Sequence, residues 1–310
     1  MRRSLPLGLL ATIAILTVAL VPGAAQEDHA VTIQSMDVRE NLYVISGGGG
    51  HTAALITEDH GVVIVDTKLA GWGQSIIDTM ALITEEPITT IINTHTHGDH
   101  VGGNADFPVA VEIIAHENTA ARMEETEAIT GQAHAQADRT YADRLTLFEG
   151  RDQIDLYHFG AGHTDGDTIV VFPALRTIHM GDLFAFLGPP YIDVNNGGSG
   201  VAYPDTLEAI VAAFDDVERV IPGHIPPPPG SPIYGSSACR PSCSGWSGWQ
   251  EVVNYAQFNR DFLDSVRASH TAGRSVTEAI AALDLWSRYP AYGQNRADAN
   301  VEAIYDELDR

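Results

Sequence analysis

The chain is poor in positive charge. Only 17 of its 310 residues are lysine or arginine, against 41 aspartates and glutamates, and the formal net charge is −24. Lys68 is the single lysine. Because nucleic acids and anionic membrane surfaces bind proteins through basic patches, this composition argues against both as partners. A small-molecule substrate is the partner class that remains.

Long apolar runs are also missing, except at the start of the chain. Two arginines at positions 2 and 3, an apolar run over residues 5–21 and small residues ending at Ala25 form the pattern of a secretory signal peptide. The alternative is a membrane anchor, but the run is at the lower limit for spanning and is interrupted by Pro6 and Gly8. We therefore expect cleavage after Ala25 and a periplasmic or secreted protein without stable membrane association.

Cysteine is scarce as well. The two cysteines, Cys239 and Cys243, stand in the stretch SSACRPSCSGW. An even number of thiols in an exported protein favours a disulfide, although a loop this short limits its entropic stabilisation. Without a nearby histidine, the pair is a poor zinc site.

The remaining chain, residues 26–310, is long enough for a large buried core. Alternating and continuous apolar patterns predict strands at 31–36, 42–46, 52–57, 62–66, 88–94, 111–115, 144–148, 153–159, 168–172 and 177–181. Helices are expected near 73–84, 118–138, 205–214, 246–268, 275–284 and 297–309, with a proline-rich loop over 225–245. Two β-rich halves that each close with helices indicate a sheet-on-sheet core with helices outside.

The stretch NTHTHGDHVGG, residues 93–103, is the strongest functional signal. It places His95, His97, Asp99 and His100 within six positions, directly after a predicted buried strand. Three neutral imidazoles in a core would need partners for six ring nitrogens, whereas imidazole and carboxylate are common metal ligands. If the backbone here is extended, His95, His97 and Asp99 point one way and His100 the other, which would let the loop serve two ions.

No single short loop can enclose a metal, so further ligands must come from elsewhere in the chain. Three candidates stand on glycine-marked turns: His163 in GAGHTDGD, Asp182 in HMGDLF and His224 in VIPGH. Together with the first four residues they make five imidazoles and two carboxylates, enough for two zinc ions.

HTHGDH, GHTDGD, GD and PGH, in this order and at these separations, resemble the metallo-β-lactamase superfamily of metallohydrolases over roughly residues 30–225. The resemblance implies an α+β, four-layer αββα sandwich. It implies that His95, His97 and His163 bind a first zinc ion, that Asp99, His100 and His224 bind a second, and that Asp182 bridges them. Asp66, which ends the strand VVIVD, matches a family position that supports the metal loop from behind.

The resemblance also implies a reaction. A hydroxide between the two ions would attack a carbonyl, and Asp99 would orient it and pass a proton to the leaving group. Some β-lactamases of this superfamily carry cysteine at the Asp182 position and a lysine three residues on, whereas this chain reads Asp-Leu-Phe-Ala. The bridging aspartate instead resembles glyoxalase II and the lactonases.

Two readings of the reaction therefore stay open. The leading one is an exported β-lactamase-like hydrolase with β-lactam hydrolysis as a candidate activity, and the runner-up is a lactone or thioester hydrolase. A third class, iron-dependent sulfur oxygenases on the same scaffold, is disfavoured because the full set of second-site ligands is present. Among residues near the motifs, Phe184, Tyr191 and Asn196 are candidates for substrate contacts. The sequence gives no oligomeric state.

Overall fold

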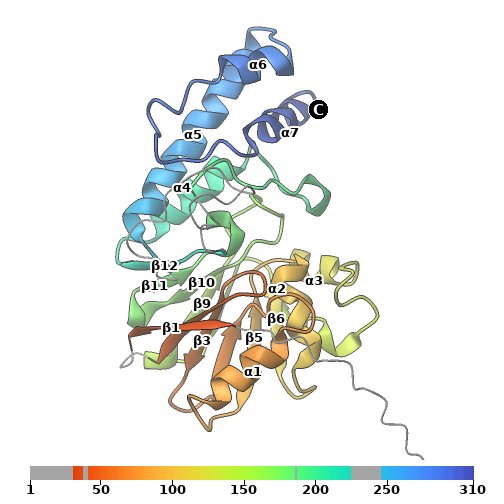
Figure 1. Cartoon of the computed structure of the whole chain (residues 1–310), viewed down its shortest axis with the longest axis vertical. Helices are drawn as coiled ribbons and strands as arrows, with labels where there is room; N and C mark the ends of the chain where they lie inside the picture. The colour runs from red at the N-terminus through yellow and green to blue at the C-terminus, as the bar shows by residue number, and fades with distance from the viewer. Residues whose placement is uncertain (1–30, 38–40, 186, 225–245) are drawn as a thin grey trace, which may run out of the picture.

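The computed structural model describes residues 31–37, 41–185, 187–224 and 246–310. In these residues two β-sheets pack against each other, and helices cover the outer face of each sheet (Figure 1). The predicted four-layer αββα architecture is confirmed. The expected signal peptide, both cysteines and the proline-rich loop lie outside the described residues.

The first sheet contains seven strands in chain order. They are β1 (Thr32–Asp37), β2 (Leu42–Ser46), β3 (Thr52–Ile56), β4 (Val62–Val65), β5 (Ile88–Asn93), β6 (Glu112–His116) and β7 (Arg139–Tyr141). The strands from β1 to β4 pair antiparallel, and those from β4 to β7 pair parallel. Every residue of β4 is buried, as expected for a strand whose two faces are both covered.

The second sheet contains six strands. In spatial order they are β13 (Ser247–Gly248), β12 (Arg219–Ile221), β11 (Thr177–His179), β10 (Ile169–Phe172), β9 (Ile154–Tyr157) and β8 (Arg144–Leu147). All neighbours are antiparallel except β11 and β12, which run parallel. The carboxyl ends of β11 and β12 therefore open on the same edge of this sheet.

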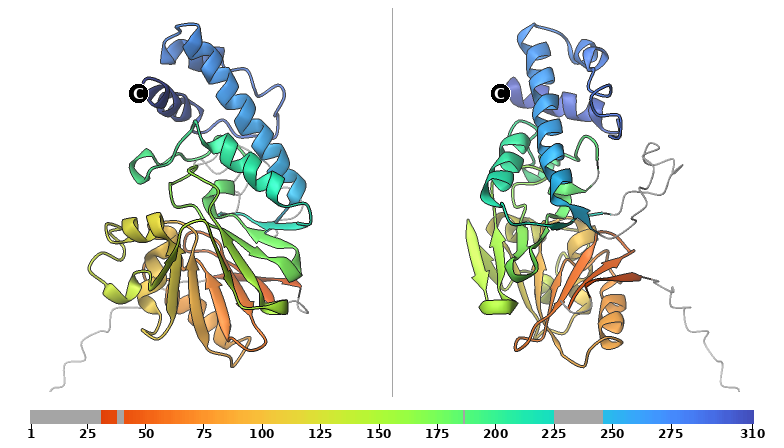
Figure 2. Two further views of the ribbon diagram at one scale, coloured as in Figure 1. Left: turned by 180° about the vertical axis from the view of Figure 1, so that it is seen from behind. Right: turned by 90° about the vertical axis from the view of Figure 1, so that its left-hand side faces the viewer.

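Helices flank the two sheets on opposite sides of the molecule (Figures 1 and 2). The helices α1 (Gly73–Ala81), α2 (Gly98–Val101) and α3 (Glu117–Met123) accompany the first sheet. The helices α4 (Tyr203–Ala213), α5 (Trp249–Thr271), α6 (Val276–Ala282) and α7 (Ala297–Leu308) lie together beyond the second. None of the helices in the described ranges combines the length and the apolar character that crossing a bilayer requires.

Three apolar layers hold this arrangement together. Between the sheets lie side chains from both, including Val65, Ile92, Leu156, Val170 and Ile221. A second layer joins the first sheet to α1, and a third joins the second sheet to the C-terminal helices. Each layer follows from strands that present apolar residues to one face or to both.

The predicted helix over 118–138 is wrong in its length. α3 ends at Met123, and turns, including Gly131 at a φ of +76°, lead on to β7. Thr126 is one cause, because its hydroxyl lies within hydrogen-bonding distance of the carbonyls of Thr96 and Arg122. Polar, alanine-rich composition favoured a helix here, and the tertiary contacts to the motif loop override it. The short strands β7 and β13 were not expected from the sequence.

We predict that Leu156→Ala lowers the free energy of unfolding by about 2–5 kcal/mol, because it removes a fully buried side chain between the sheets. Leu82→Ala is the matched control, since Leu82 is 89% exposed, and it should change stability by less than about 0.5 kcal/mol. Denaturant unfolding of the chelator-treated protein measures both, and equal effects would contradict the assigned core.

Candidate metal centre

Loops from both sheets bring the predicted ligands to one edge of the sandwich. His95 and His97 follow β5, and His163 lies between β9 and β10. Asp182 follows β11 and His224 follows β12. Carboxyl ends of parallel strands are where α/β proteins commonly build their sites. Residues more than 120 positions apart in the sequence therefore meet in one cluster.

The cluster divides into two groups of potential ligands. The first ligand group is His95, His97, His163 and Asp182, and the second is Asp99, His100 and His224. Within each group, one nitrogen or oxygen per residue lies within 4.8 Å of the others. All seven residues that the sequence indicated are thus brought together.

In the first ligand group, hydrogen bonds fix which nitrogen faces inward. His97 Nε2 lies 2.7 Å from Asp193 Oδ2, and His163 Nδ1 lies 2.7 Å from the carbonyl oxygen of Tyr191. Carboxylate and carbonyl oxygens only accept, so both of these nitrogens carry protons. His97 Nδ1 and His163 Nε2, which are 3.0 Å apart, therefore present their lone pairs to each other.

His95 is oriented through a relay. Thr94 donates its hydroxyl proton to Asp66 Oδ2 over 2.7 Å, so the same hydroxyl accepts from His95 Nδ1 at 3.0 Å. His95 Nε2 is left buried without a hydrogen-bond partner. A buried acceptor of this kind is costly unless a ligand satisfies it.

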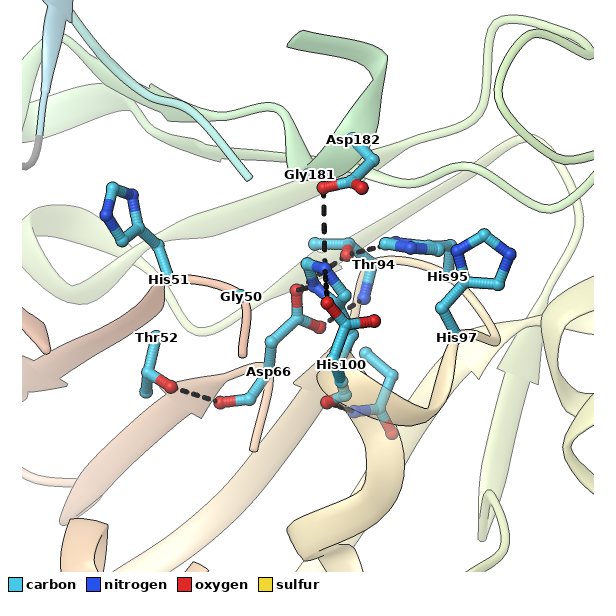
Figure 3. Close-up of polar contacts among 12 residues, drawn as sticks. Gly50, His51, Thr52, Asp66, Thr94, His95, His97, His100, Gly181 and Asp182 are labelled. Carbon is cyan, nitrogen blue, oxygen red and sulfur yellow. Dashed lines mark hydrogen bonds and ion pairs between the residues drawn. The ribbon is translucent and has the colours of Figure 1, made fainter. Parts of the chain in front are cut away.

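In the second ligand group, His100 is held in the same way. Its Nδ1 lies 2.7 Å from Asp66 Oδ2, so Nε2 is the free acceptor. This Nε2 lies 3.3 Å from His224 Nε2, and His224 Nε2 lies 3.3 Å from Asp99 Oδ2. Figure 3 shows Asp66 on one side of His100 and Asp182 on the other.

Asp182 lies between the two groups. Its Oδ1 is 3.4 Å from His100 Nε2, and its Oδ2 is 3.8 Å from His163 Nε2 and 3.3 Å from His224 Nε2. Oδ1 is buried and makes no hydrogen bond. One carboxylate thus faces imidazoles of both groups.

These observations fit divalent metal ions. The lone pairs of His97 Nδ1 and His163 Nε2, which face each other across 3.0 Å, repel unless a cation binds both. Imidazole nitrogen and carboxylate oxygen are common ligands of divalent transition metals. A further combination, Asp66 with His95 and His100, meets the same distance criterion, but Asp66 already accepts three hydrogen bonds, from Thr94 N, Thr94 Oγ1 and His100 Nδ1.

Burial and neighbouring charges give the histidines of the two ligand groups different pKa values. Burial lowers the pKa of His163 to about 4 and, with neighbouring imidazoles, places the pKa of His95 well below its usual value. Burial also opposes a charge on His100, but the carboxylates of Asp182 and Asp66 outweigh it and raise the pKa of His100 well above the usual value. His95 and His163 are therefore ready to bind metal, whereas a proton competes for His100.

The backbone of the motif differs from the extended form considered for it. After His97 the chain turns into the short helix α2, so Asp99 and His100 are adjacent helical residues and both face the second group. The predicted alternation of side chains is wrong for this reason. The glycines that the turn requires are Gly102 and Gly103, where a Cβ would lie 2.5 Å from Ala70 N and 2.1 Å from Thr67 O.

Thr94 and Asp193 are functional residues that the motif analysis missed. Thr94 precedes the motif and has no ligand atom of its own in either group. Asp193 lies in YIDVNNGG, where its Oδ1 also accepts from the backbone nitrogens of Asn195 and Asn196. In sequence this is an ordinary turn signal, so only the tertiary structure reveals its contact with His97.

The loop over residues 191–200, here called the 191–200 loop, holds two first-group histidines through Tyr191 and Asp193. It is itself held by α7. Glu307 accepts hydrogen bonds from Ser199 Oγ at 2.5 Å and from Gly200 N at 2.7 Å. The C-terminal helices therefore support the first ligand group indirectly.

The three candidate substrate contacts have different surroundings. Phe184 is 2% exposed and packs against Tyr255 in the hydrophobic core, away from solvent. Tyr191 is 45% exposed, and its ring centroid lies 5.7 Å from that of His97. Asn196 donates to Asp193 Oδ2 at 2.6 Å. For Tyr191 and Asn196 a role in substrate binding stays a prediction.

Comparison with known proteins agrees with this geometry. Residues 46–224 match the family model described as the Metallo-beta-lactamase superfamily. The chain is 35% identical over 209 residues to the 2,4-dinitroanisole O-demethylase subunit alpha of Nocardioides sp. (strain JS1661), covering 66% of this chain and 60% of that protein. It thus spans less than two thirds of that relative.

Two more distant relatives have other activities in their names. Metallo-beta-lactamase type 2 of Elizabethkingia meningoseptica is 23% identical, over 64% of this chain and 80% of that protein. Hydroxyacylglutathione hydrolase of Synechococcus sp. (strain JA-3-3Ab) is 29% identical, over 51% and 53%. Among solved structures, a metallo-beta-lactamase from Pontibacter korlensis superposes with a TM-score of 0.60 at 16% identity, covering 74% of this chain and 99% of that one.

We predict that Asp193→Asn and Asp66→Asn affect metal binding differently. Among the seven candidate ligands the side chain of Asp193 hydrogen-bonds only His97, so the loss of its charge should weaken binding at the first ligand group by roughly tenfold to a hundredfold and spare the second. Asp66 orients both His95 and His100, so its loss should weaken both. Competition titrations with Zn²⁺ and a chelator measure this, and equal losses in Asp193→Asn would contradict the assignment.

Acidification should empty the second ligand group first. The pKa of His163 is about 4, so protons compete with metal for this residue only near pH 4 and below. The pKa of His100 is raised well above its usual value, so protons compete with metal for His100 at a higher pH. Metal content measured after dialysis at stepwise lower pH should fall from two ions to one before it falls to none. A single joint loss would overturn this ordering.

Proposed function

The chain belongs to the metallo-β-lactamase superfamily, and from this premise we propose that it is a metal-dependent hydrolase that uses two zinc ions to hydrolyse a carbonyl compound. β-Lactams are the leading substrate class. Lactones and thioesters are the second. We further propose that the protein is exported to the periplasm or secreted, on the basis of the apolar start of the chain.

The position of Asp182 is the observation that supports two ions over one. Its carboxylate faces His163 of the first ligand group and His100 and His224 of the second. Burial opposes the negative charge, but His224 and His100 outweigh it and hold the pKa of Asp182 well below its usual value. An ionised carboxylate between two groups of candidate ligands suits a pair of cations better than a single one.

When bound, two zinc ions would supply Lewis acidity toward the substrate and make water a stronger acid. The protein supplies the rest. His95 and His163 are buried, His97 is half-buried, and hydrogen bonds orient all three rings, which define one side of the reaction site. Asp99 is the more open acidic group, with a side chain 31% exposed against 12% for Asp182. We assign Asp99 to orient the attacking water and to carry a proton to the leaving group.

The substrate class rests on the relatives and on the sequence after Asp182. A metallo-beta-lactamase and a hydroxyacylglutathione hydrolase are both among the relatives, which supports carbonyl substrates of the lactam and thioester types. Leu183, Phe184 and Ala185 follow Asp182, so a lysine three residues on is absent. This difference is the specific observation that keeps lactones and thioesters as the alternative. The O-demethylase relative adds aryl ethers to the compounds worth testing.

We predict that the protein purified without residues 1–25 contains about two zinc ions per chain. Asp182→Asn should reduce the content to about one and lower kcat/KM by roughly a hundredfold or more, because it removes the shared carboxylate. Asp264→Asn, at an exposed position on α5, is the control and should retain both ions and the activity. Elemental analysis and a panel of β-lactams, lactones and thioesters provide the measurements.

Two outcomes would overturn the proposal. One iron per chain, unchanged in Asp182→Asn, would indicate the redox chemistry of the sulfur oxygenases instead. Two zinc ions without turnover of any panel member would leave the centre intact and exclude these carbonyl substrates.

A further inference from the structure

The only lysine of the chain is buried beside the metal centre. Lys68 follows β4, is 0% exposed and has a left-handed backbone with a φ of +71°. Its Nζ donates to the carbonyl oxygens of Ile45 at 2.9 Å and Gly50 at 2.8 Å. Burying an ammonium group is costly, so a side chain in this position needs a compensating role.

Two nearby carboxylates, those of Asp66 and Asp99, partly offset the cost of burying the Lys68 ammonium group. Burial lowers the pKa of Lys68 to about 7, and the carboxylates of Asp66 and Asp99 oppose this. In the described part of the chain the hydrogen bonds of Nζ go to backbone carbonyl oxygens and not to a carboxylate. The direct partners of Lys68 are therefore the two backbone carbonyls, at the two ends of the segment from Ile45 to Gly50.

This segment contains the glycine run Gly47–Gly50, which we call the glycine loop. The loop lies directly on the second ligand group. Gly50 N donates to the carbonyl oxygen of Asp99 at 3.0 Å, and a Cβ on Gly50 would lie 2.2 Å from His100 Cε1. A Cβ on Gly49, whose φ is +117°, would lie 2.7 Å from Asp99 O. Glycine is therefore required at both positions.

His51, the residue after the glycine loop, contacts the turn that leads to His224, the third residue of the second ligand group. His51 N donates to the carbonyl oxygen of Gly223 at 2.7 Å, and Gly223 directly precedes His224. Figure 3 shows Gly50 and His51 beside Asp66 and His100. The glycine loop thus contacts Asp99 and His100, and His51, which follows the loop, contacts the residue next to His224.

We propose that Lys68 is a positioning residue for the second metal ion, which it serves by holding the glycine loop against Asp99, His100 and the turn before His224. This inference rests on the proposed two-metal centre. Lys68 contacts none of the ligand atoms, and its Nζ is directed to backbone carbonyls, so its effect passes through the loop. The three histidines of the first ligand group are oriented by Asp193, Tyr191 and Thr94, and none of these hydrogen bonds involves the glycine loop.

The test is the metal affinity of Lys68→Met, which keeps the apolar stem and removes the donors. Titration with Zn²⁺ against a chelator should show second-site binding weakened by about tenfold or more, with first-site binding unchanged within roughly threefold. Leu263→Ala is the matched control, because Leu263 is fully buried in the C-terminal core far from the loop in sequence. It should lower stability and leave both affinities unchanged.

A second readout uses the wild-type protein and does not require the variant to fold. Because Lys68 is the only lysine, protein labelled with ¹³C and ¹⁵N lysine gives a single side-chain signal. The signal should move when the second equivalent of Zn²⁺ binds and stay in place during the first.

The outcomes separate this inference from the proposed function. Two ions in the wild type with equal loss at both sites in Lys68→Met, or no loss at either, overturn the role of Lys68 alone. A lysine signal that moves with the first equivalent does the same. A wild type that binds one ion overturns the two-metal proposal, and the role of Lys68 with it.

Discussion

The carboxylate of Asp66 is the interaction on which the metal centre depends. It is fully buried at the end of β4, and it receives the backbone nitrogen and hydroxyl of Thr94 and Nδ1 of His100. Through these contacts one anion fixes the ring orientation of a histidine in each ligand group. The left-handed backbone of Asp66, with a φ of +63°, is the strained conformation that turns its side chain toward the motif loop. The buried strand β4 fixes the position of the Asp66 carboxylate, and its hydrogen bonds to Thr94 and His100 fix the orientation of the His95 and His100 rings.

Much of the site could be predicted from sequence because metal ligands are few in type and closely spaced. HTHGDH indicated four candidate ligands, the glycine-marked turns indicated His163, Asp182 and His224, and the structure brings all seven together. The strands of the two sheets were also predictable, since β4 and β10 are continuous apolar runs. These features depend on local pattern, which a sequence records directly.

Other features depend on contacts between distant segments, and no local pattern records them. Asp193 contacts His97 across 96 positions, yet its neighbours indicate only a turn. The early end of α3 depends on Thr126 meeting the motif loop, and the turn at α2 depends on Gly102 and Gly103 approaching the segment around Lys68. Phe184 stands two positions after Asp182, but its side chain packs against Tyr255 of α5 in the hydrophobic core. Proximity in sequence to a ligand was therefore a poor guide to substrate contact.

The hold of α7 on the 191–200 loop has a consequence for how such an enzyme can diversify. The residues that orient His97 and His163 belong to a loop whose other end is secured by a helix near the carboxyl terminus. Mutations in that helix can therefore change the geometry at the first metal without altering any ligand. The candidate ligands and the C-terminal helix are mechanically coupled through this loop, so adaptation to a new substrate can begin far from the reacting atoms.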